Sequence, residues 1–212
     1  MNTSHSPNHQ PPPSLRDRKK DRTRHTIQTQ ALRLFAEKGY QATTIQEIAA
    51  AAEVAPRTFF RYFPTKEEVV FWSQHQPMLA GFVAARPDHE PAVQALRHGI
   101  VDGLASFYDQ DRDRLLERIK LTFRTPALHP RLRQQQADWA VALAAILADR
   151  LDARPDDLQV RTIAAAAAAA VWVAIEEWQA HDGRGDLRAL IDRALGTVLA
   201  DPQPATAASK RR

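Results

Sequence analysis

The charged side chains of this chain include a small excess of cations, and that excess lies near the N-terminus. Residues 1–75 hold 11 Lys and Arg against 7 Asp and Glu, whereas residues 76–212 are balanced, so the net charge of +4 comes from the N-terminal part. A basic N-terminal region followed by a region of balanced charge is typical of a protein that binds phosphate groups. The alternative is that these cations are only solvated.

The sequence lacks the residues that disulfides, metal sites and catalytic sites require. The chain has no cysteine, so it can form no disulfide and has neither a thiolate metal ligand nor a cysteine nucleophile. Asp109-x-Asp111-x-Asp113 begins like a calcium loop, but Arg114 stands where that loop needs glycine and Lys120 where it needs glutamate. No nucleophile–base set or glycine-rich phosphate loop is visible. We therefore expect no enzyme, no metal site and no cofactor.

The spacing of apolar residues predicts an all-α fold. Steps of three and four recur, and no segment alternates apolar and polar residues as a half-buried strand does. Gly39 is expected to end the first helix in a left-handed conformation. The expected helices cover about 18–38, 44–52, 56–63, 65 to 78 or beyond, 91–109, 111–124, 131–151, 156–180 and 186–200.

Nothing in the chain predicts export or insertion into a membrane. The N-terminus has no apolar stretch after a basic start, unlike a secretory signal. The longest apolar run, residues 163–175, is shorter than the roughly 18–20 residues of a membrane span. We expect a cytoplasmic protein with no membrane partner.

Two short helices flank a tight turn between residues 44 and 63. Thr44 and Glu47 predict a capping box at the start of the first helix, and the fixed φ of Pro56 suits the first position of the second. Braced by a longer helix, such a pair presents its second helix to the major groove of DNA. The pattern alone is weak, because similar pairs occur in ordinary helical bundles.

The stretch from Arg22 to Phe71 resembles the DNA-binding domain of the TetR family. The matching motifs are Ala31-x-x-Leu34-Phe35-x-x-x-Gly39-Tyr40, Thr43-Thr44-Ile45-x-x-Ile48-Ala49 and Arg61-Tyr62-Phe63-Pro64-Thr65-Lys66. The resemblance implies an N-terminal three-helix helix-turn-helix domain joined to a C-terminal helical ligand-binding and dimerisation bundle. The expected divisions are a disordered tail over 1–14, a DNA-binding domain over 15–75, an effector-binding and dimerisation domain over 76–200 and a tail over 201–212.

The function implied by the resemblance is transcriptional regulation. Most members of the family are repressors. The resemblance therefore implies a homodimer that binds a palindromic operator in double-stranded DNA and leaves it when a small-molecule effector binds. The alternative is a helical small-molecule-binding or scaffolding bundle that does not bind DNA.

The resemblance also implies which residues contact DNA. Arg57 matches a base-facing position, where a guanidinium can bond to guanine O6 and N7, and Ala55 and Pro56 could pack on a thymine methyl. Cations from Arg16 to Arg24 could follow the phosphates or enter the minor groove as an arm. Alternatives are that Thr44 only caps its helix, and that Arg57 and Lys66 are simply solvated. The candidate DNA-binding residues are Arg22, Arg24, Thr44, Ala55, Pro56, Arg57, Thr58, Arg61, Tyr62 and Lys66.

Three residues depart from the family pattern. Ala55 stands where a serine cap is usual, and Phe60 replaces a tyrosine whose hydroxyl would bond to phosphate. Glu53 replaces a glycine, so we expect the turn to avoid positive φ. These changes would shift the affinity onto Arg57, the neighbouring candidate contacts and the basic arm.

The C-terminal half is expected to hold the dimer interface and the effector site. Apolar residues recur at steps of three and four along both of the last two helices, as in a seam between packed helices. The alternative is that both stripes pack within one monomer. The expected seam comprises Val160, Ala164, Ala167, Val171, Ala174, Trp178, Leu187, Ile191, Leu195 and Val198.

The candidate effector pocket comprises Phe107, Arg118, Phe123 and Trp139, and either Arg118 or Arg124 could face an anionic group. The alternative is that the aromatic residues belong to the core. The helix-turn-helix sequence is similar to a subgroup that includes regulators of mycofactocin clusters, some of which respond to acyl-CoA.

Overall fold

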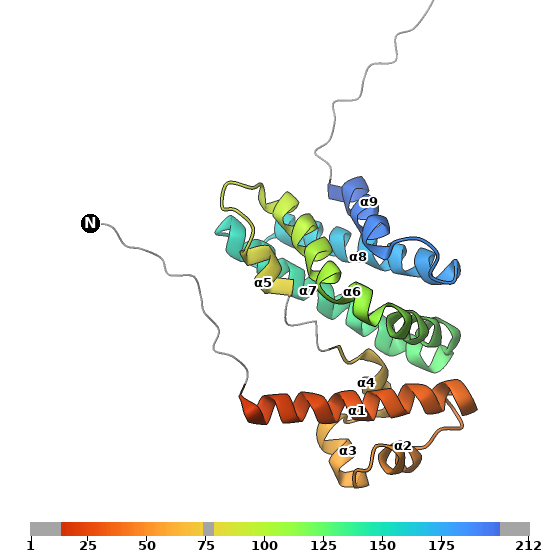
Figure 1. Ribbon diagram of the computed structural model, residues 1–212. Helices are drawn as coiled ribbons and strands as arrows, with labels where there is room; N and C mark the ends of the chain where they lie inside the picture. Colours follow the sequence, from red (N-terminus) through yellow and green to blue (C-terminus); the bar gives the residue numbers. More distant parts are fainter. Residues whose placement is uncertain (1–13, 74–78, 200–212) are drawn as a thin grey trace, which may run out of the picture. The chain divides into compact units, whose positions relative to one another are not determined.

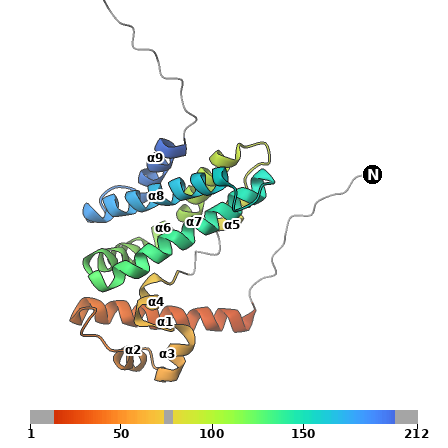
Figure 2. The ribbon, with the colours of Figure 1, turned by 180° about the vertical axis from the view of Figure 1, so that it is seen from behind.

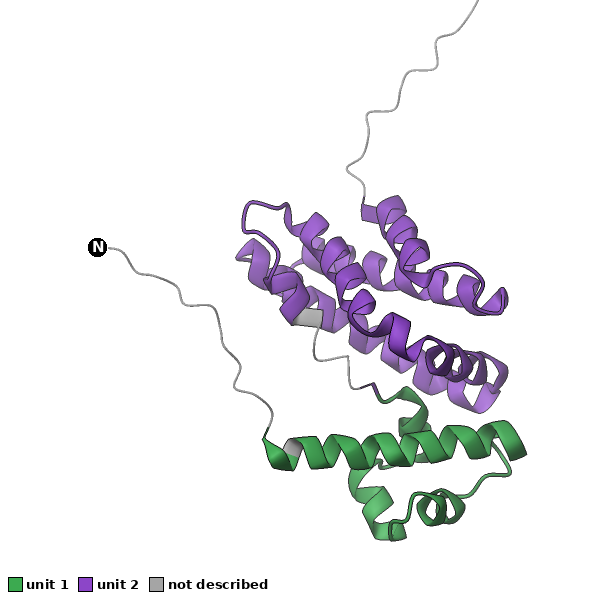
Figure 3. Cartoon of the chain, viewed as in Figure 1, with its two compact units in different colours: residues 1–72 green, residues 73–212 purple. Residues whose placement is uncertain are grey.

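The computed structural model describes residues 14–73 and 79–199, and in these residues the regular elements are helices. The all-α prediction is confirmed. The chain divides into two compact units, residues 1–72 and 73–212 (Figure 3). The expected boundary at residues 75–76 lies outside the described residues, as do the expected tails except for Ser14.

The described residues of the first unit, 14–72, form four helices (Figure 1): α1 Leu15–Lys38, α2 Ile45–Ala51, α3 Pro56–Tyr62 and α4 Lys66–Phe71. Helix α1 is followed by Gly39 at φ +85°, as expected. Helix α4 was expected to continue toward Met78, but it ends at Phe71 because the backbone of Trp72 is extended. Residues 74–78 are not described.

The core of the first unit holds the two short helices in place. Phe59 and Phe63 of the α3 region are buried, with ring centroids 5.9 Å apart, as expected for core residues. Burial of each phenyl ring stabilises the unit by about 1.5–3 kcal/mol. The other buried apolar residues include Ile27, Ala31, Leu34 and Phe35 of α1, Ile48 and Ala49 of α2, and Val69 and Val70 of α4.

The second unit contains α5 Leu79–Ala84, α6 Ala92–Arg124, a 3₁₀ turn at Pro126–Leu128, α7 His129–Leu151, α8 Leu158–Ala180 and α9 Leu187–Leu199. Helix α6 packs against α7 and α9, and α8 packs against the same two, so four long helices enclose one core (Figures 1 and 2). The predicted break between residues 109 and 111 is wrong. No glycine or proline interrupts α6 there, and Asp111 and Arg114 lie 3.8 Å apart on the continuous helix.

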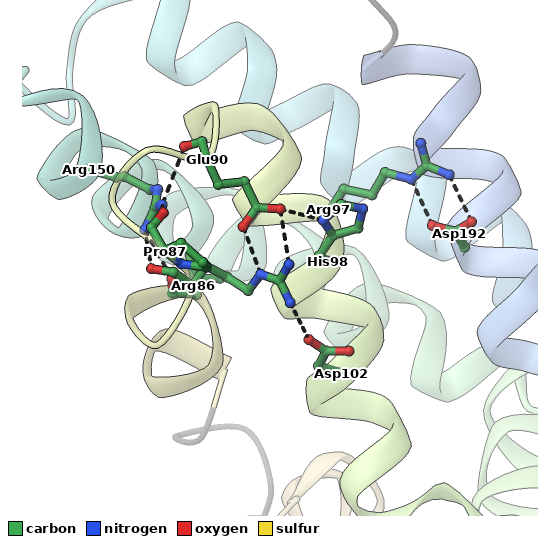
Figure 4. Close-up of polar contacts among 9 residues, drawn as sticks. Arg86, Pro87, Glu90, Arg97, His98, Asp102, Arg150 and Asp192 are labelled. Carbon is green, nitrogen blue, oxygen red and sulfur yellow. Dashed lines mark hydrogen bonds and ion pairs between the residues drawn. The ribbon is translucent and has the colours of Figure 1, made fainter.

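A polar network fastens the segment between α5 and α6 (Figure 4). The Arg86 guanidinium bonds to both oxygens of Glu90, at 2.7 and 3.1 Å, and to Asp102 at 3.1 Å. His98 Nδ1 lies 2.5 Å from Glu90 Oε1. Arg150 of α7 donates to four backbone carbonyls, those of Val83, Arg86, Pro87 and Glu90. These bonds join α5 and its following loop to α6 and α7.

Helix α8 is apolar over most of its circumference. Among the described helices it is the one that is long and apolar enough to cross a membrane by length and composition. A core helix passes the same test, and α8 buries Val160, Ala167 and Val171 in the bundle. The core therefore accounts for the apolar residues on the buried side of α8, whereas Leu158 and Val173 are exposed.

The stripe expected to form a dimer seam instead fills the core of one chain. Nine of its ten residues are at most 4% exposed, because α6 and α7 cover the faces of α8 and α9 that carry them. Val198 is the exception, at 46% exposed. The seam prediction is wrong for the other nine: Val160, Ala164, Ala167, Val171, Ala174, Trp178, Leu187, Ile191 and Leu195.

Candidate nucleic-acid interface

The start of α2 is a capping box, as the sequence predicts. The Thr44 side chain accepts a hydrogen bond from Glu47 N at 3.2 Å, and Glu47 Oε2 accepts one from Thr44 N at 2.9 Å. Lys38 Nζ lies 2.5 Å from Glu47 Oε1. Hydrogen bonds from Lys38 and Thr44 lower the pKa of Glu47 to about 2. The exposed Thr44 therefore has a capping role that does not require DNA.

Glu53, in the turn after α2, has a left-handed backbone conformation. This corrects the expectation that the turn avoids positive φ. The φ of Glu53 is +55°, and the helix ends with bonds from Glu53 N to Ala50 O at 3.1 Å and from Val54 N to Ala49 O at 2.9 Å. This pair of bonds is a Schellman motif, whose geometry requires positive φ at the residue after the cap. The hydrogen-bonded turn outweighs the steric cost at a residue with a Cβ.

Helix α3 has a buried face and an exposed face. Phe59 and Phe63 point into the core, whereas Ala55, Pro56, Arg57, Phe60 and Arg61 are exposed, and Thr58 and Tyr62 are half-buried. Ala55 makes no side-chain cap, as expected. The Arg61 guanidinium lies 5.1 Å from the centre of the Tyr62 ring. The structure thus brings two arginines and one phenyl ring together on a single exposed surface.

The basic arm is helical. Residues 15–24 form the first turns of α1, which starts three residues before the expected Arg18. Arg22 is exposed, whereas Arg24 is half-buried and lies 3.8 Å from Asp21. The cations of the basic arm therefore lie on a helix, and not on an extended segment that could enter a minor groove.

Lys66 has protein partners that the sequence did not predict. Its Nζ donates to Tyr40 O at 2.7 Å and Thr43 O at 3.0 Å, and it lies 4.2 Å from the centre of the Tyr40 ring. Partial burial lowers the pKa of Lys66. The Tyr40 hydroxyl donates to Glu67 at 2.6 Å, and burial together with that carboxylate raises the pKa of Tyr40.

Gln28 is a second contact that sequence reasoning missed. It is buried on α1, and its amide donates to Val69 O and Trp72 O, both at 2.8 Å, at the end of α4. The available signal was a polar residue at a core-facing position, one residue after Ile27 and three before Ala31. Helix α4 is therefore held to the rest of the first unit at both ends.

The four candidate pocket residues are all half-buried in the second unit. Phe107, Arg118 and Phe123 lie on α6 and Trp139 on α7, and Phe123 and Trp139 pack against the bundle core. Burial lowers the pKa of Arg118 to about 10, with the Asp111 carboxylate acting in the opposite direction. Among the described residues, no group of three His, Asp or Glu side chains could hold a metal ion.

Comparison with known proteins assigns both units to one family. Residues 27–71 match the family described as bacterial regulatory proteins, tetR family, and residues 90–202 match the MftR C-terminal domain. The chain is 36% identical over 187 residues to the HTH-type transcriptional regulator TcmR of Streptomyces glaucescens, covering 78% of this chain and 77% of TcmR. It is 27% identical over 163 residues to the putative mycofactocin biosynthesis transcriptional regulator MftR of Mycobacterium tuberculosis, covering 76% of this chain and 82% of MftR.

Solved structures agree with this assignment. Thermus thermophilus FadR, a TetR-family transcriptional repressor in complex with lauroyl-CoA, superimposes with a TM-score of 0.54 at 26% identity, covering 85% of this chain and 98% of FadR. SmeT in its triclosan complex shares the fold, with a TM-score of 0.57 at 19% identity, covering 86% of this chain and 99% of SmeT. The chain belongs to the TetR family of bacterial transcriptional regulators and carries a C-terminal domain of the MftR type.

Proposed function

We propose that this protein is a cytoplasmic repressor that binds a palindromic operator as a homodimer and leaves it when a small molecule binds. The observation that carries the proposal is the exposed face of α3, which presents Arg57, Phe60 and Arg61, while the buried Phe59 anchors the opposite side of the helix. The Arg57 guanidinium can make paired hydrogen bonds with guanine, and the Arg61 guanidinium can bind a phosphate beside the bases.

The proposed DNA contacts fall into two groups. Ala55, Pro56 and Arg57 read bases, whereas Thr58, Arg61 and Tyr62 bind phosphates beside them. Thr44 and the cations of the α1 arm, including Arg22 and Arg24, add phosphate contacts.

Selection of binding sites from random duplex DNA at moderate salt tests the proposal. A palindromic consensus is expected, and recovery of no shared site would favour the alternative of a helical bundle without DNA binding. Arg57→Ala should relax the preference at one position of each half-site, with a loss of about 1–3 kcal/mol of discrimination. A uniform loss on all sequences would instead assign Arg57 to phosphate.

The homodimer is proposed to form through the solvent-facing sides of α8 and α9. Opposite its buried stripe, α8 exposes Leu158 and Val173, 78% and 62% exposed, and α9 exposes Val198. The alanines at 165 and 169 on the same side of α8 are also exposed, so a second copy could approach the helix backbone closely. A dimer places two reading helices about 34–36 Å apart, as successive major grooves on one side of DNA require.

Sedimentation of charged variants tests this surface. Val173→Asp and Val198→Asp should shift the mass from a dimer toward the 23.8 kDa monomer. Val141→Asp is the matched control, because Val141 is 72% exposed but lies on α7. A dimer that survives both α8 and α9 changes, or dissociates equally with the control, would contradict the assignment.

The proposed effector is an amphipathic anion of the acyl-CoA kind. Support comes from the lauroyl-CoA bound to the FadR relative and from the desolvated Arg118 guanidinium of the second unit, in which the three candidate aromatic residues are also half-buried. Phe107, Phe123 and Trp139 would contact the acyl chain, and Arg118 would face an anionic group.

Release of the selected DNA should be measured with lauroyl-CoA, lauric acid and coenzyme A separately. We expect release by lauroyl-CoA and a weaker response in Arg118→Met, with Arg124→Met as the exposed control on the same helix. Equal responses of the two variants would remove Arg118 from the site. No response to any of the three compounds would exclude this ligand class without affecting the DNA result.

A further inference from the structure

Lys66 ties together the two ends of the segment that reads DNA. This segment begins after Thr43, runs through α2, the Glu53 turn and α3, and ends at Lys66, the first residue of α4. The bond from Lys66 Nζ to Thr43 O joins residues 23 positions apart, and the bond to Tyr40 O joins residues 26 positions apart. The chain between them is thereby closed into a ring.

The surroundings of the ammonium favour this arrangement over an outward one. Two carbonyl oxygens and the face of the Tyr40 ring lie against Nζ, and a cation over an aromatic ring is attracted to it. Partial burial lowers the pKa of Lys66, which agrees with an ammonium that has exchanged water for these partners. A move toward a phosphate would break both hydrogen bonds.

The acceptor side of the ring is itself rigid. Thr43 is buried, and its hydroxyl donates to Gly39 O at 2.9 Å and Leu34 O at 3.2 Å at the end of α1. A second tie runs parallel to the first, from the Tyr40 hydroxyl to Glu67 of α4. Helix α4 is thus joined to the turn that leads into α2 through two adjacent residues, Lys66 and Glu67.

The two helices inside the ring need such a constraint. Each has seven residues, whereas isolated helices shorter than about 12–15 residues are marginal in water. Closing a segment reduces the number of conformations that its ends can adopt. The angle between α2 and α3 sets how the exposed face of α3 enters the groove, so loss of the tie would loosen the element that determines affinity and specificity.

We propose that Lys66 closes the helix-turn-helix into a ring and acts as a positioning residue for DNA binding, rather than as a phosphate contact. The proposal rests on the DNA-binding function above. It differs from the role that the family resemblance implies for this position, and the two roles predict different responses to salt.

Lys66→Met, which keeps much of the aliphatic stem, is the main variant, measured in the full-length dimer against the selected operator. A lost phosphate contact would lower the slope of log affinity against log salt by about 0.9. We expect the slope to stay within about 0.3 of wild type while operator affinity falls about tenfold or more. In the free protein, amide hydrogen exchange should become faster across α2 and α3.

Two further variants keep the test decisive if Lys66→Met unfolds the first unit. Tyr40→Phe removes only the tie to Glu67, and it should weaken operator binding with no change in salt slope, since tyrosine carries no positive charge. Where Lys66→Met stays folded, the effects of the two changes should combine to less than their product, because both release the same junction. Thr65→Ala removes the α4 cap, which accepts from Glu68 N at 3.3 Å, and should speed exchange in α4 but not in α2.

The proposal would be overturned if Lys66→Met lowered the salt slope by about 0.9, the value for one phosphate contact, while amide hydrogen exchange in the free variant stayed unchanged. Unchanged operator affinity in that variant, or independent effects of Tyr40→Phe and Lys66→Met, would also overturn it. If wild-type protein selects no DNA site, the proposed function fails, while exchange in the free protein still decides whether Lys66 closes the ring.

Discussion

Replacement of Glu53 by glycine should stabilise the first unit. Glu53 holds φ +55° at the end of α2, a conformation that costs a residue with a Cβ about 1–2 kcal/mol. Glycine avoids this cost but loses about 0.5–1 kcal/mol more conformational freedom on folding. The difference predicts a gain of about 1 kcal/mol in the free energy of unfolding of this unit.

The assay is amide hydrogen exchange at Val54, whose N–H bonds to Ala49 O across the turn at 2.9 Å, together with thermal unfolding. Exchange of this amide should slow about fivefold in Glu53→Gly, as expected for about 1 kcal/mol. Glu53→Gln is the control, because it removes the carboxylate from the C-terminal end of α2 and keeps the backbone cost. Glu53→Asn should lie between them, since asparagine tolerates this conformation. Equal stabilisation by glutamine and glycine would refute the backbone argument and assign the effect to charge.

Three other changes test contacts that stabilise each unit internally. Gln28→Leu leaves two carbonyls at the end of α4 without their donor, and should lower the free energy of unfolding of the first unit by about 2 kcal/mol in denaturant titrations. Gly99→Ala would place a Cβ 2.5 Å from Val83 Cγ2 and 2.9 Å from its Cα, so α5 must shift from α6; calorimetry should show a loss of about 1–3 kcal/mol in the second unit. Hydrogen bonds from Arg86 and then His98 lower the pKa of Glu90 from 4.5 to about 2, so the stability that this carboxylate contributes is complete above pH 4.5 and is lost as the pH falls toward 2. Circular dichroism of the second unit against pH should show a weaker dependence over that window in Glu90→Gln, and an unchanged dependence would contradict the assignment.

Local signals predicted much of the first unit correctly. The Thr44 capping box, the left-handed Gly39 and the proline at the start of α3 each depend on residues a few positions apart, which the sequence places in reach of one another. The burial of Phe59 followed from the same short-range periodicity. The exception was Glu53, where the requirement of the Schellman motif prevailed over the preference of its side chain.

Contacts between distant residues could not be predicted in this way. Lys66 looked like a surface cation beside the reading helix, and only the fold brings its ammonium to carbonyls 23 and 26 residues earlier in the chain. Gln28 likewise meets its acceptors 41 and 44 residues later. Such partners depend on how helices cross, which periodicity within one helix does not specify.

The sequence by itself determined an all-helical regulator of the TetR family, because helix spacing, caps and family motifs are written in short stretches of chain. It did not determine which side of α8 faces inward, since Ala164–Ala170 makes the helix apolar all round. The tertiary structure decided that α6 and α7 cover the stripe through Val171, which leaves the opposite side, with Val173, open to solvent. Whether an apolar residue is buried depends on which helices pack against it. The hydrophobic effect favours packing against a helix of the same chain and against a helix of a second copy equally.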